Sequence, residues 1–202
     1  MSINPITKLI LIFISGLLLS LSAPGYDLWF LAWIALSPLF IIINTSKLIK
    51  ETVFYSFIFG FAYNLWYLHW IFSLHPLAWL GFGNTSSLLI SFFALIVVTT
   101  YNALFFALFG AVVAYHKKIS PTPYNKGILN LLLTTIFWLV IFNKLSSCKF
   151  LLGFPWTLIE YSQYKNLFLI QTSEYFGSLS ISFMIVFLNQ VVANFFIWVF
   201  NI

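Results

Sequence analysis

The sequence has 202 residues, of which 62% are hydrophobic, 21% are aromatic and only 6% are charged. A soluble domain usually carries about 25% charged residues, so the charged side chains here are too few to cover a water-exposed surface. A disordered chain is excluded as well, because disorder requires low hydrophobicity. The composition therefore predicts a membrane protein, and the length allows about six helices of ~20 residues joined by short loops.

Apolar runs separated by polar segments and by Pro and Gly indicate the helices. In chain order the runs are Ile6–Leu21, Leu28–Ile43, Val53–Phe72, Ser87–Tyr115, Ile128–Phe142 and about Gln171–Val199. The first, second and fifth runs are short for a complete span. A polar and aromatic segment, Asn143–Asn166, separates the last two runs. We therefore expect an all-α fold, a polytopic transmembrane helix bundle of about six spans, which forms one domain over residues 1–202.

The basic residues are all lysines, nine in number, and they are scattered between the apolar runs. This distribution lacks the clustered basic face of a nucleic-acid-binding protein, so we expect no nucleic-acid partner. Cytoplasmic loops of membrane proteins are enriched in Lys. A cytoplasmic N-terminus places six lysines inside, namely Lys8, Lys47, Lys50, Lys117, Lys118 and Lys126, and leaves Lys144, Lys149 and Lys165 outside. We therefore expect a multi-pass protein of the bacterial inner membrane with a cytoplasmic N-terminus.

Side chains that could act as acids, bases, nucleophiles or metal ligands are scarce. They are Asp27, Glu51, Glu160, Glu174, His69, His75, His116 and Cys148. The spacing of His69 and His75 does not place both on one helical face, so we expect no metal site and no cofactor. Cys148 lies near Lys144 and Lys149, which would favour a thiolate. It has no histidine or carboxylate close in sequence, and we interpret it as an inert loop thiol.

Glu174 falls early in the last apolar run and allows two interpretations. An ionisable residue inside a span is energetically costly and usually has a function. Alternatively, the helix begins near Tyr175, and Glu174 is an N-terminal residue favoured by the helix dipole.

The most unusual segment is the sequence G-F-P-W followed after four residues by Y-S-Q. Its aromatic rings and rigid proline could line a path for lipid tails, and the flanking Lys149 and Lys165 could attract lipid phosphate. The alternative is a re-entrant interfacial loop without a ligand. The candidate lipid-contacting residues are Gly153, Phe154, Pro155, Trp156, Tyr161, Ser162, Gln163 and Glu174.

The same segment resembles the G-F-P-W and Y-S-Q signature of the bacterial apolipoprotein N-acyltransferases. Further along the chain, Leu21–Trp33 resembles the family's segment between its first two helices, and Gly60–Ile71 resembles its third helix. Glu174–Phe183 resembles the family's E-x-x-G and L-S-F stretch, which Asn189 and Ala193 continue. The family usually has a Glu and an Arg shortly before G-F-P-W, whereas residues 143–147 here contain neither.

This resemblance implies a family that moves an acyl chain from a phospholipid to the N-terminal cysteine amine of a lipoprotein, on the outer face of the bacterial inner membrane. In the family the reaction runs through a thioester on a cysteine, assisted by a glutamate and a lysine. These residues lie in a nitrilase-like domain that follows a seventh helix. No residue here matches that catalytic set. We therefore expect the N-terminal membrane domain alone, with no catalytic residue and no activity by itself.

Several accounts of the function remain open at this point. In the first, the chain holds phospholipid and lipoprotein acyl chains for a separate nitrilase-like catalytic polypeptide encoded by a split gene. The gene could instead be decaying, or the sequence could be a fragment. A non-catalytic lipid-binding or scaffold role is a different class of function. A small transporter would be expected to carry intramembrane charges at pseudo-symmetric positions, but Glu174 has no counterpart in the first half.

Overall fold

The computed structural model describes residues 4–120 and 127–201, so that Lys126 lies outside the described residues. Over these ranges the chain contains helices and no strand, which confirms the predicted all-α class. The α-helices are α1 (Pro5–Ser20), α2 (Ser37–Thr45), α3 (Ile49–Tyr67), α4 (Asn84–Ile119), α5 (Ile128–Trp138), α6 (Leu167–Phe176) and α7 (Leu179–Phe200). Short 3₁₀ turns are η1 (Trp29–Trp33), η2 (His69–Leu74), η3 (Ala78–Leu80), η5 (Lys149–Leu151) and η6 (Ile159–Gln163), and the π-helix η4 (Leu139–Leu145) continues α5.

The expected count of six spans is not confirmed. Among the described residues, three helical segments are long and apolar enough to cross a membrane: α4, α5 with η4, and α7. The remaining apolar runs form shorter or interrupted helices. The last run does not begin near Gln171, because Gly177 adopts a positive φ of 71° and separates the short helix α6 from α7.

The second apolar run is divided into η1 and the nine-residue helix α2. A break in a helix frees backbone groups that need partners where water is absent. Asn189 of α7 supplies them, because its amide nitrogen donates to the carbonyl of Ala32 at 2.8 Å and its oxygen accepts from the backbone nitrogen of Leu36 at 3.0 Å. The same oxygen accepts from the hydroxyl of Ser37 at 3.0 Å. One buried asparagine therefore supplies hydrogen-bond partners for backbone groups at the break and joins α7 to α2.

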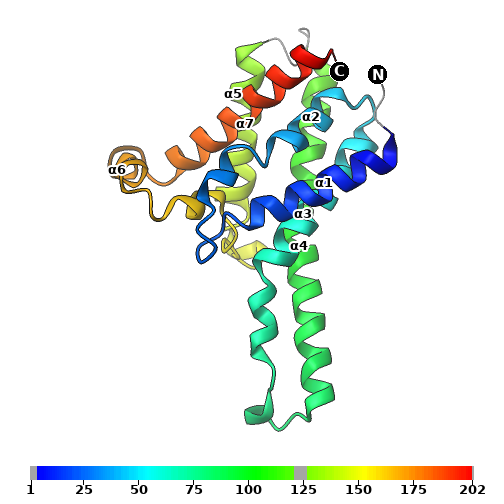
Figure 1. Ribbon diagram of the computed structural model, residues 1–202, viewed down its shortest axis with the longest axis vertical. Coiled ribbons are helices and arrows are strands. Elements are labelled where there is room, and N and C mark those ends of the chain that lie inside the picture. Colours follow the sequence, from blue (N-terminus) through cyan, green and yellow to red (C-terminus); the bar gives the residue numbers. More distant parts are fainter. Residues whose placement is uncertain (1–3, 121–126, 202) are drawn as a thin grey trace.

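Helices α3 and α4 form the central packed pair, and Figure 1 shows α4 extending beyond the bundle beside η2 and η3 as a long arm. The two helices approach closely because small residues lie at their crossing. A methyl group on Gly60 would lie 2.5 Å from the ring of Phe106. The same Phe106 ring packs against Trp138 and Phe142, with ring centroids 5.7 and 4.5 Å away. This aromatic cluster joins α5 and η4 to the central pair.

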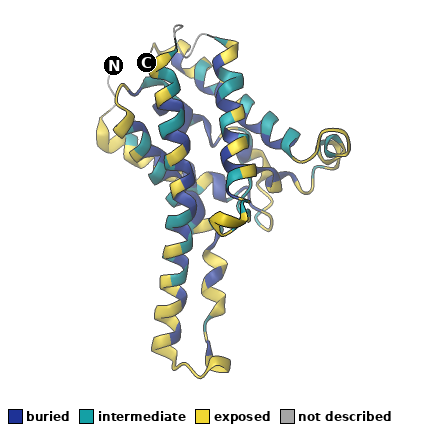
Figure 2. Ribbon diagram, turned by 180° about the vertical axis from the view of Figure 1, so that it is seen from behind, coloured by how far each residue is buried: buried dark blue, intermediate teal, exposed yellow. Residues whose placement is uncertain are grey.

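The burial pattern differs from that of a soluble protein. Large apolar side chains lie on the outside, as along the arm in Figure 2, where Trp79 is 76% exposed. By contrast, the amide side chains of Asn64, Gln163 and Asn189 are completely buried. In a bilayer the apolar surface faces lipid, while polar groups find partners inside the protein. The arrangement therefore fits a protein whose solvent is lipid.

Candidate functional site

The G-F-P-W segment forms a tight turn after the π-helix η4. Leu152 and Gly153 both adopt a positive φ, of 63° and 52°. The backbone nitrogen of Gly153 donates to the carbonyl of Cys148 at 3.1 Å, and that of Phe154 donates to the carbonyl of Ser146 at 3.1 Å. Two consecutive left-handed residues reverse the chain, and the glycine at the second position adopts this conformation without a Cβ clash. The turn directs the following aromatic residues toward α3 and η2.

Three aromatic side chains then stack in a row. The rings of Phe154 and Trp156 lie 4.6 Å apart at an interplanar angle of 27°, and Trp156 stacks on Trp70 of η2 at 5.4 Å and 27°. Trp156 remains 51% exposed, and Trp70 is also exposed. Close behind the stack, the hydroxyl of Tyr63 donates to the carbonyl of Thr157 at 3.0 Å, which anchors the loop to α3. Phe154, Trp156 and Trp70 therefore form a fixed, outward-facing surface, here called the aromatic stack.

Ser162 and Gln163 do not share this surface, although the sequence placed them among the candidate lipid-contacting residues. Both are buried in η6. The side-chain oxygen of Gln163 accepts from the indole nitrogen of Trp33 at 3.2 Å, and its amide nitrogen donates to the carbonyl of Trp29 at 3.1 Å. The same amide nitrogen donates to the hydroxyl of Ser162 at 2.8 Å. The two residues therefore fasten η6 to η1, and of the Y-S-Q group only Tyr161 reaches the surface.

Glu160 is the residue that sequence reasoning missed. It is only 6% exposed, and its carboxylate accepts hydrogen bonds from the amide of Asn143 at 2.6 Å and from the hydroxyl of Ser182. Burial raises the pKa of Glu160, and the hydrogen bonds from Ser182 and Asn143 offset part of that rise. The residue joins η6 to η4 and to α7. The signal in the sequence was a lone carboxylate between Trp156 and Tyr161, in an otherwise apolar and aromatic segment.

Glu174 lies in the last turn of α6 and is exposed. Both interpretations of this residue were wrong, because it is neither inside a long apolar helix nor at the N-terminus of the following one. That helix, α7, begins only at Leu179. The helix α6 packs against α7 at the outer edge of the molecule (Figure 1), and the structure does not place Glu174 in the aromatic stack.

Lys165 is engaged in an exposed ion pair with Asp27. Its ammonium group lies 2.6 Å from a carboxylate oxygen of Asp27, and the hydroxyl of Tyr164 donates to the other oxygen at 2.7 Å. The hydrogen bonds from Lys165 and Tyr164 lower the pKa of Asp27, and the carboxylate raises the pKa of Lys165 in return. This contact joins the first loop to the segment after η6. Lys149 is exposed beside the G-F-P-W turn, and Cys148 is a free, half-buried thiol.

The site therefore consists of an aromatic stack held from behind by polar contacts with α3, η1, η4 and α7. In the part of the chain that the structure describes, no group of three or more His, Cys, Asp or Glu side chains could hold a metal ion. The arrangement offers a surface for apolar ligands, but it does not assemble a nucleophile with an acid and a base.

Comparison with known proteins gives one consistent result. Residues 15–191 match the family model described as the apolipoprotein N-acyltransferase N-terminal domain. The chain is 28% identical over 181 residues to the apolipoprotein N-acyltransferase of Nostoc sp., which covers 87% of this chain and 34% of the relative. The corresponding protein of Geobacter metallireducens is 30% identical over 182 residues, or 88% of this chain and 31% of the relative.

A third relative, the apolipoprotein N-acyltransferase 1 of Treponema denticola, is 29% identical over 192 residues, covering 93% of this chain and 31% of the relative. These matches confirm the resemblance that the motifs indicated. The chain spans about a third of the length of the curated relatives that it matches.

Proposed function

Because the chain belongs to the family of apolipoprotein N-acyltransferase N-terminal domains, we propose that it is the membrane part of such an acyltransferase and serves lipoprotein maturation. In this proposal it holds the acyl chains of phospholipid and lipoprotein for acyl transfer from the phospholipid to the N-terminal cysteine of the lipoprotein. The catalytic groups for that transfer are assigned to a nitrilase-like domain outside these 202 residues.

The observation that carries this proposal is the aromatic stack. Trp156 and Trp70 are exposed, yet their rings are held by stacking, and the loop behind them is hydrogen-bonded to α3. Indole rings favour the headgroup level of a bilayer, where one side contacts acyl chains and the other contacts polar groups. A rigid aromatic surface at this level can align an acyl chain with little loss of side-chain entropy on binding.

The proposed orientation places the aromatic stack toward the outer face of the bacterial inner membrane and the N-terminus in the cytoplasm. Lysines that end α4 and begin α3 lie at the end of the bundle where both termini lie (Figure 1). Cytoplasmic ends of membrane helices are enriched in such residues, which supports this orientation.

The experiment is photocrosslinking of the full chain in vesicles with a phospholipid that carries a photoreactive acyl chain. The Trp156→Ala and Tyr161→Ala variants should each crosslink less than the parent chain, because they remove exposed aromatic surface from the loop. Trp79→Ala is the matched control, since Trp79 is also exposed but lies in η3 on the arm. An equal loss in the control, or no loss in either loop variant, would remove the support for a lipid-holding surface here.

A further inference from the structure

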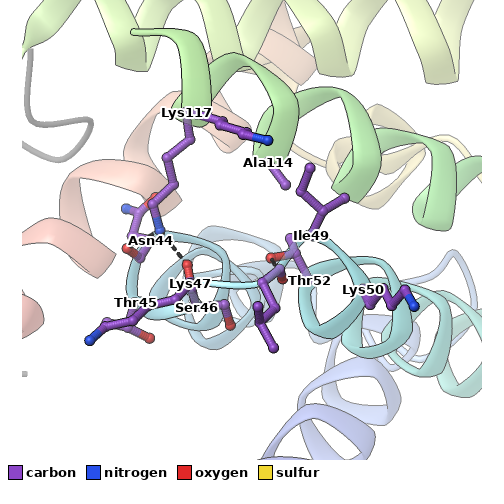
Figure 3. Close-up of a pocket in the computed structure, with 11 residues that line it drawn as sticks. Asn44, Thr45, Ser46, Lys47, Ile49, Lys50, Thr52, Ala114 and Lys117 are labelled. Atoms are coloured by element: carbon purple, nitrogen blue, oxygen red, sulfur yellow. Dashed lines mark hydrogen bonds between the residues drawn. The ribbon is translucent and has the colours of Figure 1, made fainter. Parts of the chain in front are cut away.

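A cavity lies away from the aromatic stack, at the end of the bundle that holds both termini. Its volume is about 900 Å³. Figure 3 shows the cavity between the C-terminus of α2, the following connection, the first turn of α3 and the last turns of α4. Four of its lining residues are lysines, namely Lys47, Lys50, Lys117 and Lys118.

Lys117 has a structural role in this cavity. Its ammonium group donates to the carbonyls of Ile43, Asn44 and Ser46 at 3.1, 2.6 and 2.7 Å, and the bond to Ser46 is drawn in Figure 3. These carbonyls lie at the C-terminus of α2, where the helix dipole is negative. All three donors of the ammonium group are therefore used, and the negative end of α2 is neutralised. The cavity wall formed by α2 does not repel an anion.

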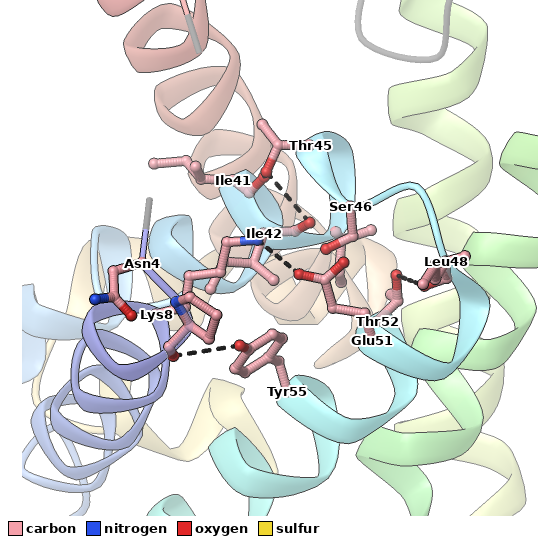
Figure 4. A network of polar contacts seen from close by, with 12 residues as sticks. Asn4, Lys8, Ile41, Ile42, Thr45, Ser46, Leu48, Glu51, Thr52 and Tyr55 are labelled. Atoms are coloured by element: carbon pink, nitrogen blue, oxygen red, sulfur yellow. Dashed lines mark hydrogen bonds and ion pairs between the residues drawn. The ribbon is translucent and has the colours of Figure 1, made fainter. Parts of the chain in front are cut away.

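The other three lysines add positive charge without partners. Lys47, Lys50 and Lys118 are exposed, and within residues 4–120 and 127–201 none of them forms a hydrogen bond or an ion pair. Among residues 4–120 and 127–201, the one acidic side chain near the cavity is Glu51, and it lies 2.6 Å from the ammonium group of Lys8 on α1 (Figure 4). Because Lys8 compensates this acid, the cavity has an uncompensated positive charge.

Neutral donors also converge on the cavity. The N-terminus of the 19-residue helix α3 has no side-chain cap, so the first N–H groups of the helix lack partners, and Ile49 and Lys50 of this turn line the cavity. A helix N-terminus of this kind favours an anion.

We propose that this cavity binds the phosphate of an anionic phospholipid headgroup. Phosphate matches the lysines and the uncapped N-terminus of α3, and free phosphate shares that chemistry. The surroundings favour a lipid as its source, because Leu48 on the cavity rim is 67% exposed and the neighbouring Ile119 is exposed too. Basic pockets between membrane helices are suited to anionic headgroups. The site differs from the aromatic stack, and it depends on the chain being in a membrane but not on acyl transfer.

The test measures how much phospholipid the purified full chain retains from vesicles of phosphatidylglycerol and from vesicles of phosphatidylcholine. The parent chain should retain the anionic lipid preferentially. Each lysine near an anionic surface contributes about fivefold to binding, so Lys47→Gln with Lys50→Gln should weaken retention of phosphatidylglycerol by about 25-fold. Lys47→Gln alone should weaken that retention about fivefold. Its matched control is Lys144→Gln, which removes the same charge from an exposed position outside the cavity and should retain the lipid.

An unchanged retention in the chain with Lys47→Gln and Lys50→Gln, or an equal loss in Lys47→Gln and Lys144→Gln, would overturn the proposal in favour of diffuse charge attraction.

Competition with inorganic phosphate distinguishes the two sources of the anion. The competition compares inorganic phosphate with sodium chloride at the same ionic strength. The lipid assignment fails, and the site takes free phosphate, if two results are obtained together. Phosphate displaces phosphatidylglycerol where sodium chloride does not, and the parent chain shows no preference between the two lipids. The Lys47→Gln and Lys50→Gln variants should keep the photocrosslinking of the aromatic stack. Trp156→Ala should keep the retention of phosphatidylglycerol, so that the two proposals can fail separately.

Discussion

Replacing Gln163 by Leu tests whether the loop with the aromatic stack is held from behind. The parent side chain makes three hydrogen bonds, to the indole of Trp33, the carbonyl of Trp29 and the hydroxyl of Ser162. A leucine of similar size would fill the space but remove all three hydrogen bonds. At about 0.6–1 kcal/mol for each bond in a membrane protein, the expected loss is about 2–3 kcal/mol of unfolding free energy.

The assay is reversible unfolding in mixed micelles, followed by helical circular dichroism, together with photocrosslinking of phospholipid at the loop. Gln190→Leu is the matched control. Gln190 is equally buried and donates to the hydroxyl of Thr135 at 2.8 Å, but it joins α7 to α5 and does not contact the loop. Both variants should lose stability, whereas only Gln163→Leu should also reduce crosslinking under conditions where the chain remains folded. A Gln163→Leu protein with the stability and crosslinking of the parent would refute the assigned role.

Two further predictions concern the buried carboxylate and the central helix pair. Burial raises the pKa of Glu160 in the folded chain above the value in the unfolded chain. The stability that Glu160 contributes is therefore complete below the unfolded pKa and is lost as the pH rises through the folded pKa. Melting curves of Glu160→Gln should lack this decline, and an identical pH dependence in both proteins would contradict the reasoning. Gly60→Val should cost about 1–3 kcal/mol of unfolding free energy, because a methyl group there would meet the ring of Phe106 at 2.5 Å. Gly83→Ala is its control, since nothing lies within 4 Å of the added carbon, and an equal loss in both variants would rule out crowding as the cause.

The helical class and the family could be predicted from the sequence because both depend on local signals. Long apolar runs indicate helices, and the G-F-P-W segment is contiguous. The breaks were harder to predict, although Pro38 at the start of α2 and Gly177 before α7 mark them. Hydropathy counts apolar side chains and does not report where the backbone changes direction. A divided helix such as η1 with α2 therefore gives the same apolar run as a continuous one.

The contacts that hold the candidate site could not be predicted, because their partners are distant in sequence. Gln163 bonds to Trp33 across 130 positions, and Glu160 bonds to Asn143 and Ser182 across 17 and 22 positions. A polar residue in an apolar chain indicates that some partner exists, but only the fold identifies it. The same reason explains the error over Glu174, whose position depends on the break at Gly177.

The buried polar residues also explain how a chain with so few charges adopts one arrangement of its helices. Lipid contacts apolar helix surfaces as favourably as another helix does, so apolar burial alone does not select a partner. Hydrogen bonds inside the bundle do select one, since Asn189 bonds to backbone groups at the break between η1 and α2, and Glu160 bonds to Asn143 and Ser182. The bonds of Gln163 and Glu160 fasten η6, which directly follows the loop with the aromatic stack, to η1, η4 and α7. Some of the polar contacts that specify the fold therefore also hold the proposed lipid surface in place. The cavity lined by lysines lies outside this network, so its charges can be changed without disturbing the network.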